Sequence, residues 1–366
     1  MKAAVLRAFD QDLLIEDVAI ADPREREVLV RIMATGVCSS DLSTIRGKTA
    51  SALPLIPGHE AAGVVERVGS GVSKVRPGDR VVLSWAPNCG HCFYCHESHP
   101  TLCDVYGGAA VSGGLWDQTS RLGPASTPIN HYSCVSSFAE LAVVPEAGCI
   151  IIPPDVPFAV AALVGCAVTT GFGAVVNDAG VRPGDSVAVV GVGGVGINAI
   201  QAAALSGAET ILAVDSNPDK ADLARQNGAT HFLNALDEGL IDTVRGLTGG
   251  RGVDHAIECT GRPVAMRNAY AMTRPAGSVV IVGIAPVGAE LSIPAIGFPG
   301  SKKRLIGSIY GGGVPERDIT RILSLYQSGR MHLDAQIGAR IGLGQVNDAL
   351  RWLEQGVLAR TMIEFA

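Results

Sequence analysis

The sequence predicts an α/β protein in which a β-rich domain is followed by a doubly wound, six-stranded parallel sheet. Three observations lead to this prediction. Residues up to about 85 form short β-branched runs, residues 186–309 alternate apolar strands with helical stretches, and 366 residues are enough for two separate cores. Strands that alternate with helices build parallel sheets, whereas short strands broken by glycine and proline are typical of bent β-structure.

The composition indicates a globular protein with large buried surfaces. Hydrophobic residues make up 47% of the chain, charged residues 17%, and the formal net charge is −6. The chain has no basic run, so we expect no nucleic-acid partner. Charged, polar, glycine or proline residues interrupt every apolar stretch before about 18 residues, so we expect neither a membrane span nor a signal peptide.

The first domain is predicted to be compact and strongly bent. Its strands are expected in AAVLRAF, EVLVRIMATGVC, AAGVVERVGSGV and DRVVLSW, which glycine, proline and aspartate separate. Residues 104–137, rich in glycine, serine, threonine and proline, are expected to form a loop. We expect a strand at 138–144 and an alanine-rich helix at 158–178.

Four cysteines lie close together with the spacing C-x2-C-x2-C-x7-C: Cys89, Cys92, Cys95 and Cys103. Four thiolates from short loops make a closed tetrahedral zinc site. An iron–sulfur cluster also uses four cysteines, but bacterial cluster motifs place the last cysteine closer and follow it with proline. A set of unrelated thiols is the remaining alternative. The spacing therefore predicts a structural zinc, and the neighbouring histidines are interpreted as loop residues: His91, His96 and His99.

The total of nine cysteines is odd, which does not fit a framework of disulfides alone. Beside a cofactor-binding fold, clustered thiols indicate metal ligands in a reducing compartment. We therefore expect a cytoplasmic protein.

Residues 186–215 predict a strand, a glycine turn, a helix and a second strand. Ser186–Val190 is apolar and β-branched, Ile197–Leu205 is alanine-rich, and Gly207 stands at the expected helix end. Between strand and helix, a G-x-G-x-x-G pattern is formed by Gly191, Gly193 and Gly196. The first glycine allows a tight turn, the second admits a pyrophosphate, and the third lets the helix pack against the strand.

The end of the second strand indicates which dinucleotide binds. Asp215 follows the glycine turn at the distance of a ribose-binding acid, where it would accept a hydrogen bond from the 2′-hydroxyl of NAD. Its charge would repel a 2′-phosphate. The pyrophosphate would lie at the helix N-terminus. This stretch therefore predicts a Rossmann-type NAD site.

The remaining elements complete the predicted sheet and the C-terminal segment. Strands are expected at 186–190, 210–215, 230–234, 253–258, 278–283 and 305–309. Such a set matches the two mononucleotide-binding halves of a Rossmann sheet. Helices are expected at about 316–329 and 345–355, followed by the strand TMIEF, which we expect to return to the first domain.

Taken together, these motifs resemble the zinc-dependent medium-chain alcohol dehydrogenases over essentially the whole chain. Gly58–Val72, GHEAAGVVERVGSGV, fits the signature G-H-E-x2-G-x5-G-x2-V at every fixed position. The four-cysteine segment and GVGGVG add two matches in the expected order. The resemblance implies a GroES-like catalytic domain with a zinc-binding lobe at 1–167 and 310–366, and an NAD-binding domain at 168–309.

The resemblance also implies a catalytic zinc. Its ligands would be Cys38 in GVCSSD, His59 of the G-H-E signature, and Cys166 in LVGCAVTTG. Two thiolates and one imidazole leave the fourth position open, as catalysis requires. By the same resemblance, Asp41 orients His59, Glu60 lies behind the metal, and Ser40 contacts the substrate oxygen. The other thiols match no ligand position: Cys134, Cys149 and Cys259.

Cofactor and substrate residues carry over in the same way. The implied cofactor-binding residues are Gly191, Gly193, Gly194, Val195, Gly196, Asp215, Lys220 and Arg360. Of these, Arg360 is expected to reach the cofactor phosphates. Trp85, Tyr132 and Ile309 match pocket positions and indicate an apolar pocket for bulky or aryl alcohols, although Trp85 could instead close the domain core.

The implied activity is reversible hydride transfer between an alcohol and NAD, giving an aldehyde or ketone. Each chain would hold two zinc ions, one catalytic and one structural. Ser43 stands where many relatives have a histidine that ends a proton relay. Ser39 replaces an arginine or histidine that faces the pyrophosphate, which should weaken cofactor binding somewhat.

Two other functions are weighed against this one. The first is a thiol-adduct (S-hydroxymethyl) formaldehyde dehydrogenase, which Ser39 disfavours. The second is a zinc-free, reductase-like or non-catalytic relative, which the intact set of Cys38, His59 and Cys166 disfavours. The segment Trp116–Val144 resembles the longer loop of dimeric enzymes, so we expect a homodimer.

Overall fold

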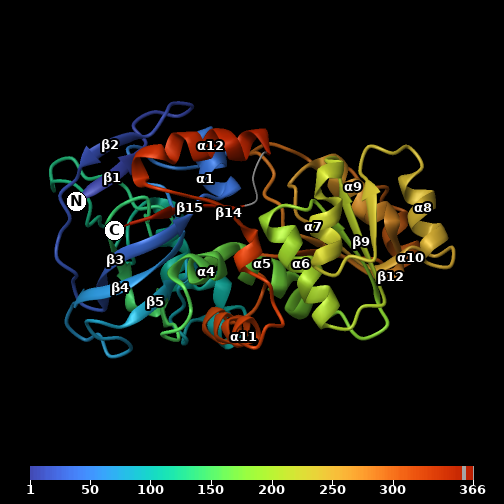
Figure 1. Ribbon diagram of the computed structural model, residues 1–366, viewed down its shortest axis with the longest axis horizontal. Helices are drawn as coiled ribbons and strands as arrows, with labels where there is room; N and C mark the ends of the chain where they lie inside the picture. The colour runs from blue at the N-terminus through green and yellow to red at the C-terminus, as the bar shows by residue number, and fades with distance from the viewer. Residues whose placement is uncertain (357–359, 366) are drawn as a thin grey trace. The chain divides into compact units, whose positions relative to one another are not determined.

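The computed structural model describes residues 1–356 and 360–365. Its chain divides into two compact units: Met1–Cys166 together with Val314–Ala366, and Ala167–Gly313. The first unit is β-rich and the second alternates strands with helices (Figure 1). The chain therefore enters the second unit beside Cys166 and leaves it at Gly313.

The first unit is built on a seven-stranded sheet with the order β14-β15-β3-β4-β5-β7, and β6 pairs with β3. The strands of this unit are β1 (Lys2–Val5), β2 (Leu14–Asp17), β3 (Glu27–Gly36), β4 (Glu60–Val68), β5 (Arg80–Leu83), β6 (Leu141–Pro145), β7 (Cys149–Ile151), β14 (Ile337–Ile341) and β15 (Arg360–Glu364). β3 is the central strand, because it pairs antiparallel with β4, β6 and β15. Through β15 the C-terminal segment joins this sheet.

Short helices connect and cover these strands: α1 (Ser39–Ile45), α2 (Phe93–His96), α3 (Asp104–Ser112), α4 (Phe158–Leu163), α11 (Pro315–Gln327) and α12 (Val346–Gln355), with 3-10 turns at Pro100–Leu102, Glu146–Gly148, Asp334–Gln336 and Leu343–Gln345. α12 contributes Val346, Ala349 and Leu350 to the core that also contains Phe138. This core lies next to α1 and so supports the helix that carries Asp41.

The structure corrects two expectations for this unit. Residues 104–112, predicted as loop, form the helix α3, which ends at Gly113 with φ +80°. Its two internal glycines have low helix propensity, so residue preferences alone do not predict a helix here. The strand predicted at 138–144 starts later than expected and is β6, Leu141–Pro145. Phe138 lies outside it, because its backbone forms hydrogen bonds with Ala4 and Pro57 instead.

The second unit contains a six-stranded sheet with the order β10-β9-β8-β11-β12-β13, in which all neighbours are parallel. Its strands are β8 (Ser186–Val190), β9 (Thr210–Asp215), β10 (His231–Asn234), β11 (Val253–Glu258), β12 (Thr273–Ile281) and β13 (Arg304–Gly307). The strand order reverses between β8 and β11, the point where dinucleotides bind in doubly wound sheets. With the β-rich first unit, this sheet confirms the predicted fold class.

The helices of the second unit are α5 (Thr169–Gly173), α6 (Gly194–Leu205), α7 (Ala221–Gln226), α8 (Leu240–Leu247), α9 (Pro263–Met272) and α10 (Gly297–Ser301), with a 3-10 turn at Pro218–Lys220. β12 begins earlier than the predicted residue 278. A register shift opposite Val253–His255 and the left-handed Ala276 (φ +59°) interrupt its alternating pattern. The bulge explains why the sequence pattern shows only the second half of this strand.

The alanine-rich stretch is helical from Phe158 to Ala179, with π-helical segments at Val164–Val168 and Ala174–Ala179. By length and by its mean hydropathy of 2.0 it could cross a membrane, but 94% of its most apolar window is buried inside the protein. That burial is typical of a core helix. The π segment matters for the site, because it carries Cys166.

Candidate functional site

Two groups of metal-ligating side chains cluster within residues 1–356 and 360–365. The first joins Cys38, His59, Glu60 and Cys166, whose donor atoms all lie within 4.8 Å of one another. Cys38 precedes α1, His59 and Glu60 stand at the start of β4, and Cys166 lies in the π segment. All four side chains are buried and belong to the first unit. Tertiary structure thus brings together the three predicted zinc ligands, and adds a carboxylate.

Asp41 organises the backbone and the imidazole of this cluster. Its Oδ2 accepts a hydrogen bond from Cys38 N, and its Oδ1 accepts from Gly58 N and His59 Nδ1, each at 3.0 Å. Asp41 is fully buried. Because Nδ1 carries the proton shared with Asp41, Nε2 is left with a lone pair for a metal. Although burial opposes its charged form, Asp41 holds the pKa of His59 well above the usual value, so a metal at Nε2 competes there with a proton.

Gly58 of the G-H-E signature has a local reason to be glycine. Its φ is +94°, and an added Cβ would lie 2.6 Å from Phe138 N and 2.7 Å from Ser137 Oγ. Only glycine adopts this conformation at low cost in so tight a space. The turn it makes directs both Gly58 N and the His59 ring toward Asp41.

Glu60 faces the cluster and is balanced by an arginine. Arg360 Nη2 lies 3.1 Å from Glu60 Oε1, and Arg360 Nη1 donates to Val37 O at 2.9 Å. Burial raises the pKa of Glu60 to about 7, against the opposing charge of Arg360. The structure therefore places Arg360 in the first unit beside Glu60, and its contact with cofactor phosphates stays a prediction.

The donor set of this cluster fits zinc. Two thiols, one imidazole and a carboxylate are ligand types that zinc accepts, and a zinc ion held by the two thiols and the imidazole would keep a fourth position for substrate. The hydrogen bond between the two thiols lowers the pKa of Cys38 well below its usual value and raises that of Cys166, so Cys38 is the thiol of this pair that ionises first. The assignment of individual ligands stays a prediction.

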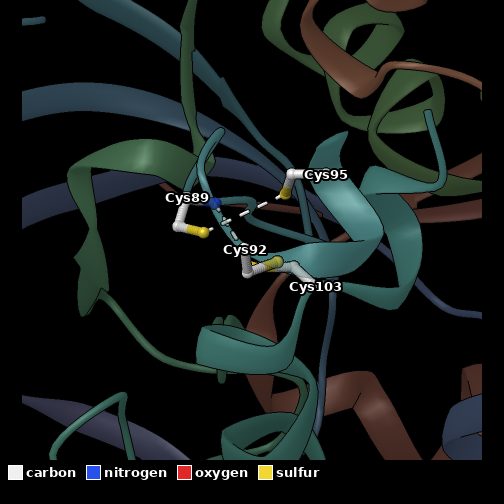
Figure 2. A group of neighbouring side chains, drawn as sticks. All are labelled: Cys89, Cys92, Cys95 and Cys103. Carbon is white, nitrogen blue, oxygen red and sulfur yellow. Dashed lines mark hydrogen bonds between the residues drawn. The ribbon is translucent and has the colours of Figure 1, made fainter. Parts of the chain in front are cut away.

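The second group is the predicted four-cysteine lobe. All nine cysteines are free thiols, and the sulfur atoms of these four lie within 4.8 Å of one another (Figure 2). Cys89 Sγ is 4.0 Å from Cys95 Sγ, and Cys92 Sγ is 3.8 Å from Cys103 Sγ. Zinc–sulfur bonds of about 2.3 Å in a tetrahedron separate the sulfurs by roughly 3.8 Å. The lobe thus has the dimensions of a closed zinc site, and the histidines of this loop are not part of the group.

Aromatic rings flank His59 on two sides. Trp85 lies edge-on to it with ring centroids 6.4 Å apart, and Tyr132 lies edge-on at 5.6 Å. Ser40 Oγ is 4.0 Å from Cys38 Sγ, so its hydroxyl lies next to a predicted ligand. Ser43 is half-buried on the same helix. Ile309, the third predicted pocket residue, belongs to the second unit and is 41% exposed.

The glycine turn of the second unit fits a phosphate group. Gly191 has φ +96°, and a Cβ on Gly196 would lie 1.8 Å from Gly191 O, so the chain itself requires both glycines. A Cβ on Gly193 would meet no protein atom within 4 Å. Because Gly193 has no side chain, space for a phosphate group stays open before the first turn of α6. Gly194 and Val195 belong to that turn.

Asp215 ends β9 beside this turn, and its carboxylate already has protein partners. Oδ2 accepts from Val192 N at 2.7 Å and lies 3.0 Å from Lys220 Nζ, and Oδ1 accepts from Asn217 N at 2.9 Å. Lys220 offsets part of the negative charge. The repulsion of a 2′-phosphate is therefore weaker than an isolated carboxylate would give.

Sequence reasoning missed one polar neighbour of the pocket residues. Thr44 is buried on α1, and its hydroxyl donates to the Tyr132 hydroxyl at 3.2 Å. A threonine in a short helix carries no signal of this role. Only the fold brings residue 44 next to residue 132.

Comparisons with known proteins show which proteins this chain is similar to. The model of the alcohol dehydrogenase GroES-like domain matches residues 24–154, and that of zinc-binding dehydrogenases matches residues 194–328. The chain is 37% identical over 365 residues to an NDMA-dependent alcohol dehydrogenase of Amycolatopsis methanolica, covering 99% of this chain and 98% of the relative. It is 35% identical over 371 residues to an S-(hydroxymethyl)glutathione dehydrogenase of Paracoccus denitrificans, covering 99% of each. Among solved structures, benzyl alcohol dehydrogenase from Acinetobacter calcoaceticus matches with a TM-score of 0.94 and 30% identity, over 100% of this chain and 99% of that one.

Proposed function

This chain belongs to the zinc-dependent medium-chain alcohol dehydrogenase family, and we propose that it oxidises bulky or aryl alcohols reversibly with NAD. It is an oxidoreductase of alcohols and aldehydes, and its family uses zinc and a nicotinamide cofactor. The observation that carries the proposal is the buried cluster of Cys38, His59 and Cys166 with Asp41 behind the imidazole.

In the proposed reaction the first unit provides the metal site and the walls around it. When bound, zinc lowers the pKa of an alcohol oxygen and the nicotinamide accepts a hydride. Cys38, His59 and Cys166 would hold the metal, and Asp41 would keep His59 in the tautomer that presents Nε2. Ser40 contacts the substrate oxygen and relays its proton: the hydroxyl accepts that proton as it passes its own proton outward toward solvent.

The pocket wall supports the choice of substrate class. The rings of Trp85 and Tyr132 flank His59, so any group bound beside this imidazole has aromatic neighbours. Such rings exclude water and offer favourable edge-to-face contacts to an aryl group. We therefore propose aryl or other bulky alcohols as substrates. A relative whose name includes benzyl alcohol gives independent support.

For the cofactor we propose NAD, bound by the glycine turn and Asp215. The open space at Gly193 supports a pyrophosphate there, and the carboxylate at the end of β9 supports a ribose with a free 2′-hydroxyl. Lys220 moderates this preference, so the discrimination against NADP should be limited.

We further propose two zinc ions per chain, a homodimer and a cytoplasmic location. Four clustered thiols support the second zinc, and nine free cysteines support a reducing compartment. For the dimer, support comes from β13, which is an edge strand of the sheet in the second unit, and from exposed apolar side chains between residues 284 and 309. These side chains are Ile284, Val287, Ile296, Phe298, Leu305 and Ile309.

The test combines metal analysis with a substrate panel. The purified protein is analysed for zinc and assayed with primary, secondary and aryl alcohols and NAD, with NADP and NDMA as separate arms. We expect two zinc ions per chain and the highest kcat/KM for aryl alcohols with NAD.

An S-hydroxymethyl thiol adduct forms one further arm, because one relative is named for such a substrate. Preference for the adduct over every free alcohol would replace our proposal with that alternative. Activity without a metal in the Cys38 cluster would refute the proposal altogether.

A further inference from the structure

The loop that carries Tyr132 is held in a strained turn. Val135 N and Ser136 N both donate to Tyr132 O, at 3.0 and 3.1 Å, and Tyr132 N donates to Ser136 Oγ at 2.8 Å. Three residues of this turn adopt left-handed φ angles that cost energy for non-glycine residues: Ser133 at 51°, Cys134 at 56° and Ser136 at 54°. Strain of this kind persists only where the surrounding structure enforces it, often beside a functional group. Here it fixes the backbone end of Tyr132.

The other end of Tyr132 is held by α1. Thr44 Oγ1 lies 3.2 Å from the Tyr132 hydroxyl and 2.9 Å from Thr49 Oγ1. Thr44 is 1% exposed, so its hydroxyl is shielded from water, whereas the Tyr132 side chain is half-buried. Between its two anchored ends, the Tyr132 ring lies edge-on to His59 at an interplanar angle of 72°. The same helix also carries Asp41, which is bonded to His59 Nδ1.

We propose that Thr44 is a positioning residue that fixes Tyr132 beside His59 and thereby sets the preference for flat aryl alcohols over small ones. This inference rests on the proposed alcohol oxidation. Without the Thr44 hydroxyl, the half-buried phenol loses a hydrogen-bond donor and the ring turns to find another partner. A ring that moves no longer leaves a space of constant shape beside His59. A flat, rigid alcohol depends on that shape, whereas a small alcohol such as ethanol does not.

The kinetic test uses Thr44→Val, which keeps the side-chain shape and removes the hydroxyl, and Thr44→Ser, which keeps the hydroxyl. For Thr44→Val we expect KM for benzyl alcohol to rise about tenfold, with kcat and the KM for ethanol changed less than about twofold. Thr44→Ser should retain the parent KM values. Because Tyr132→Phe has no phenol to satisfy, adding Thr44→Val to it should cause little further change.

A second measurement does not depend on activity. The chain has six tyrosines, so fluorotyrosine labelling gives few signals, and Tyr132→Phe identifies the one from Tyr132. In Thr44→Val this fluorine resonance should shift and broaden, and in Thr49→Val it should change less. An unchanged resonance in Thr44→Val, or an unchanged ratio of the benzyl alcohol and ethanol KM values, overturns the proposal. If the parent protein oxidises neither alcohol, the proposed function fails, while the resonance still decides whether Thr44 positions Tyr132.

Discussion

Replacing Asp41 with asparagine tests how the proposed catalytic metal site is built. Asp41 accepts three N–H groups, from Cys38 and from Gly58 and His59. An asparagine has one acceptor oxygen and one NH2 group in the same positions. If its oxygen stays with Gly58 and His59, the NH2 group faces Cys38 N. If the amide is turned, the NH2 group faces Gly58 N, and His59 must present its proton on Nε2.

Both orientations lead to a measurable loss. A buried donor without an acceptor costs about 1–3 kcal/mol. Loss of the carboxylate behind a histidine ligand lowers metal affinity by about 10- to 100-fold, which corresponds to roughly 1.4–2.7 kcal/mol. Because Asp41 is fully buried, water cannot replace the missing contacts. We therefore expect Asp41→Asn to raise the Kd for zinc at the Cys38 cluster by about 10- to 100-fold.

The assay is zinc competition against a chelator of known affinity. The four-cysteine lobe serves as an internal reference, since its affinity should not change. Glu27→Gln is the matched control, because Glu27 is an equally buried carboxylate that binds Arg121 rather than the cluster. It should lower stability and leave both zinc affinities unchanged. Equal zinc affinities in Asp41→Asn and the parent protein would show that Asp41 does not support a metal ligand.

Three further predictions address other parts of the chain. Cys89→Ser should remove one zinc ion and lower the thermal midpoint, because metal binding contributes the folding energy of the lobe. Cys38→Ser should remove the other zinc ion. A midpoint for Cys89→Ser that equals the parent's after zinc loss would contradict a structural role. Asp215→Ser should shift the ratio of kcat/KM values for NAD and NADP toward NADP by about tenfold or more. Lys220→Gln should shift this ratio toward NAD, since Lys220 offsets the charge of Asp215. Unchanged ratios would mean that the ribose does not bind at Asp215. Burial, reinforced by the charge of Arg121, lowers the pKa of His131 to about 3, so the unfolded chain binds a proton that the folded chain does not. The free energy of unfolding should therefore fall by about 2 kcal/mol between pH 6.5 and pH 5, and urea titrations of His131→Gln should show a shallower fall.

The features that sequence predicts well are those encoded within a few neighbouring residues. The glycine turn between β8 and α6 occurs where its spacing predicts it, because a tight turn and a close helix approach each require glycine locally. The thiols at 89–103 converge for the same reason, since short loops leave them little freedom to separate. Alternating apolar runs likewise predict the parallel sheet of the second unit.

The first metal cluster is different, because no local rule links Cys38, His59 and Cys166. The prediction of these residues comes from the resemblance to a family. They become neighbours only in the folded chain, through the pairing of β3 with β4 and through the π-helical segment. α3 escaped prediction because its glycines have low helix propensity, and it forms where the chain continues from the cysteine lobe.

The hydroxyl contact between Thr44 and Tyr132 belongs wholly to the tertiary structure. The two residues are far apart in the chain, and neither type signals a partner by itself. The sequence determines the local turns and the cysteine-rich loop, because their free energy comes from the conformations of adjacent residues. The fold alone decides which polar side chains meet in the interior, because each buried hydroxyl must find a partner among groups that strand pairing and helix packing bring within reach.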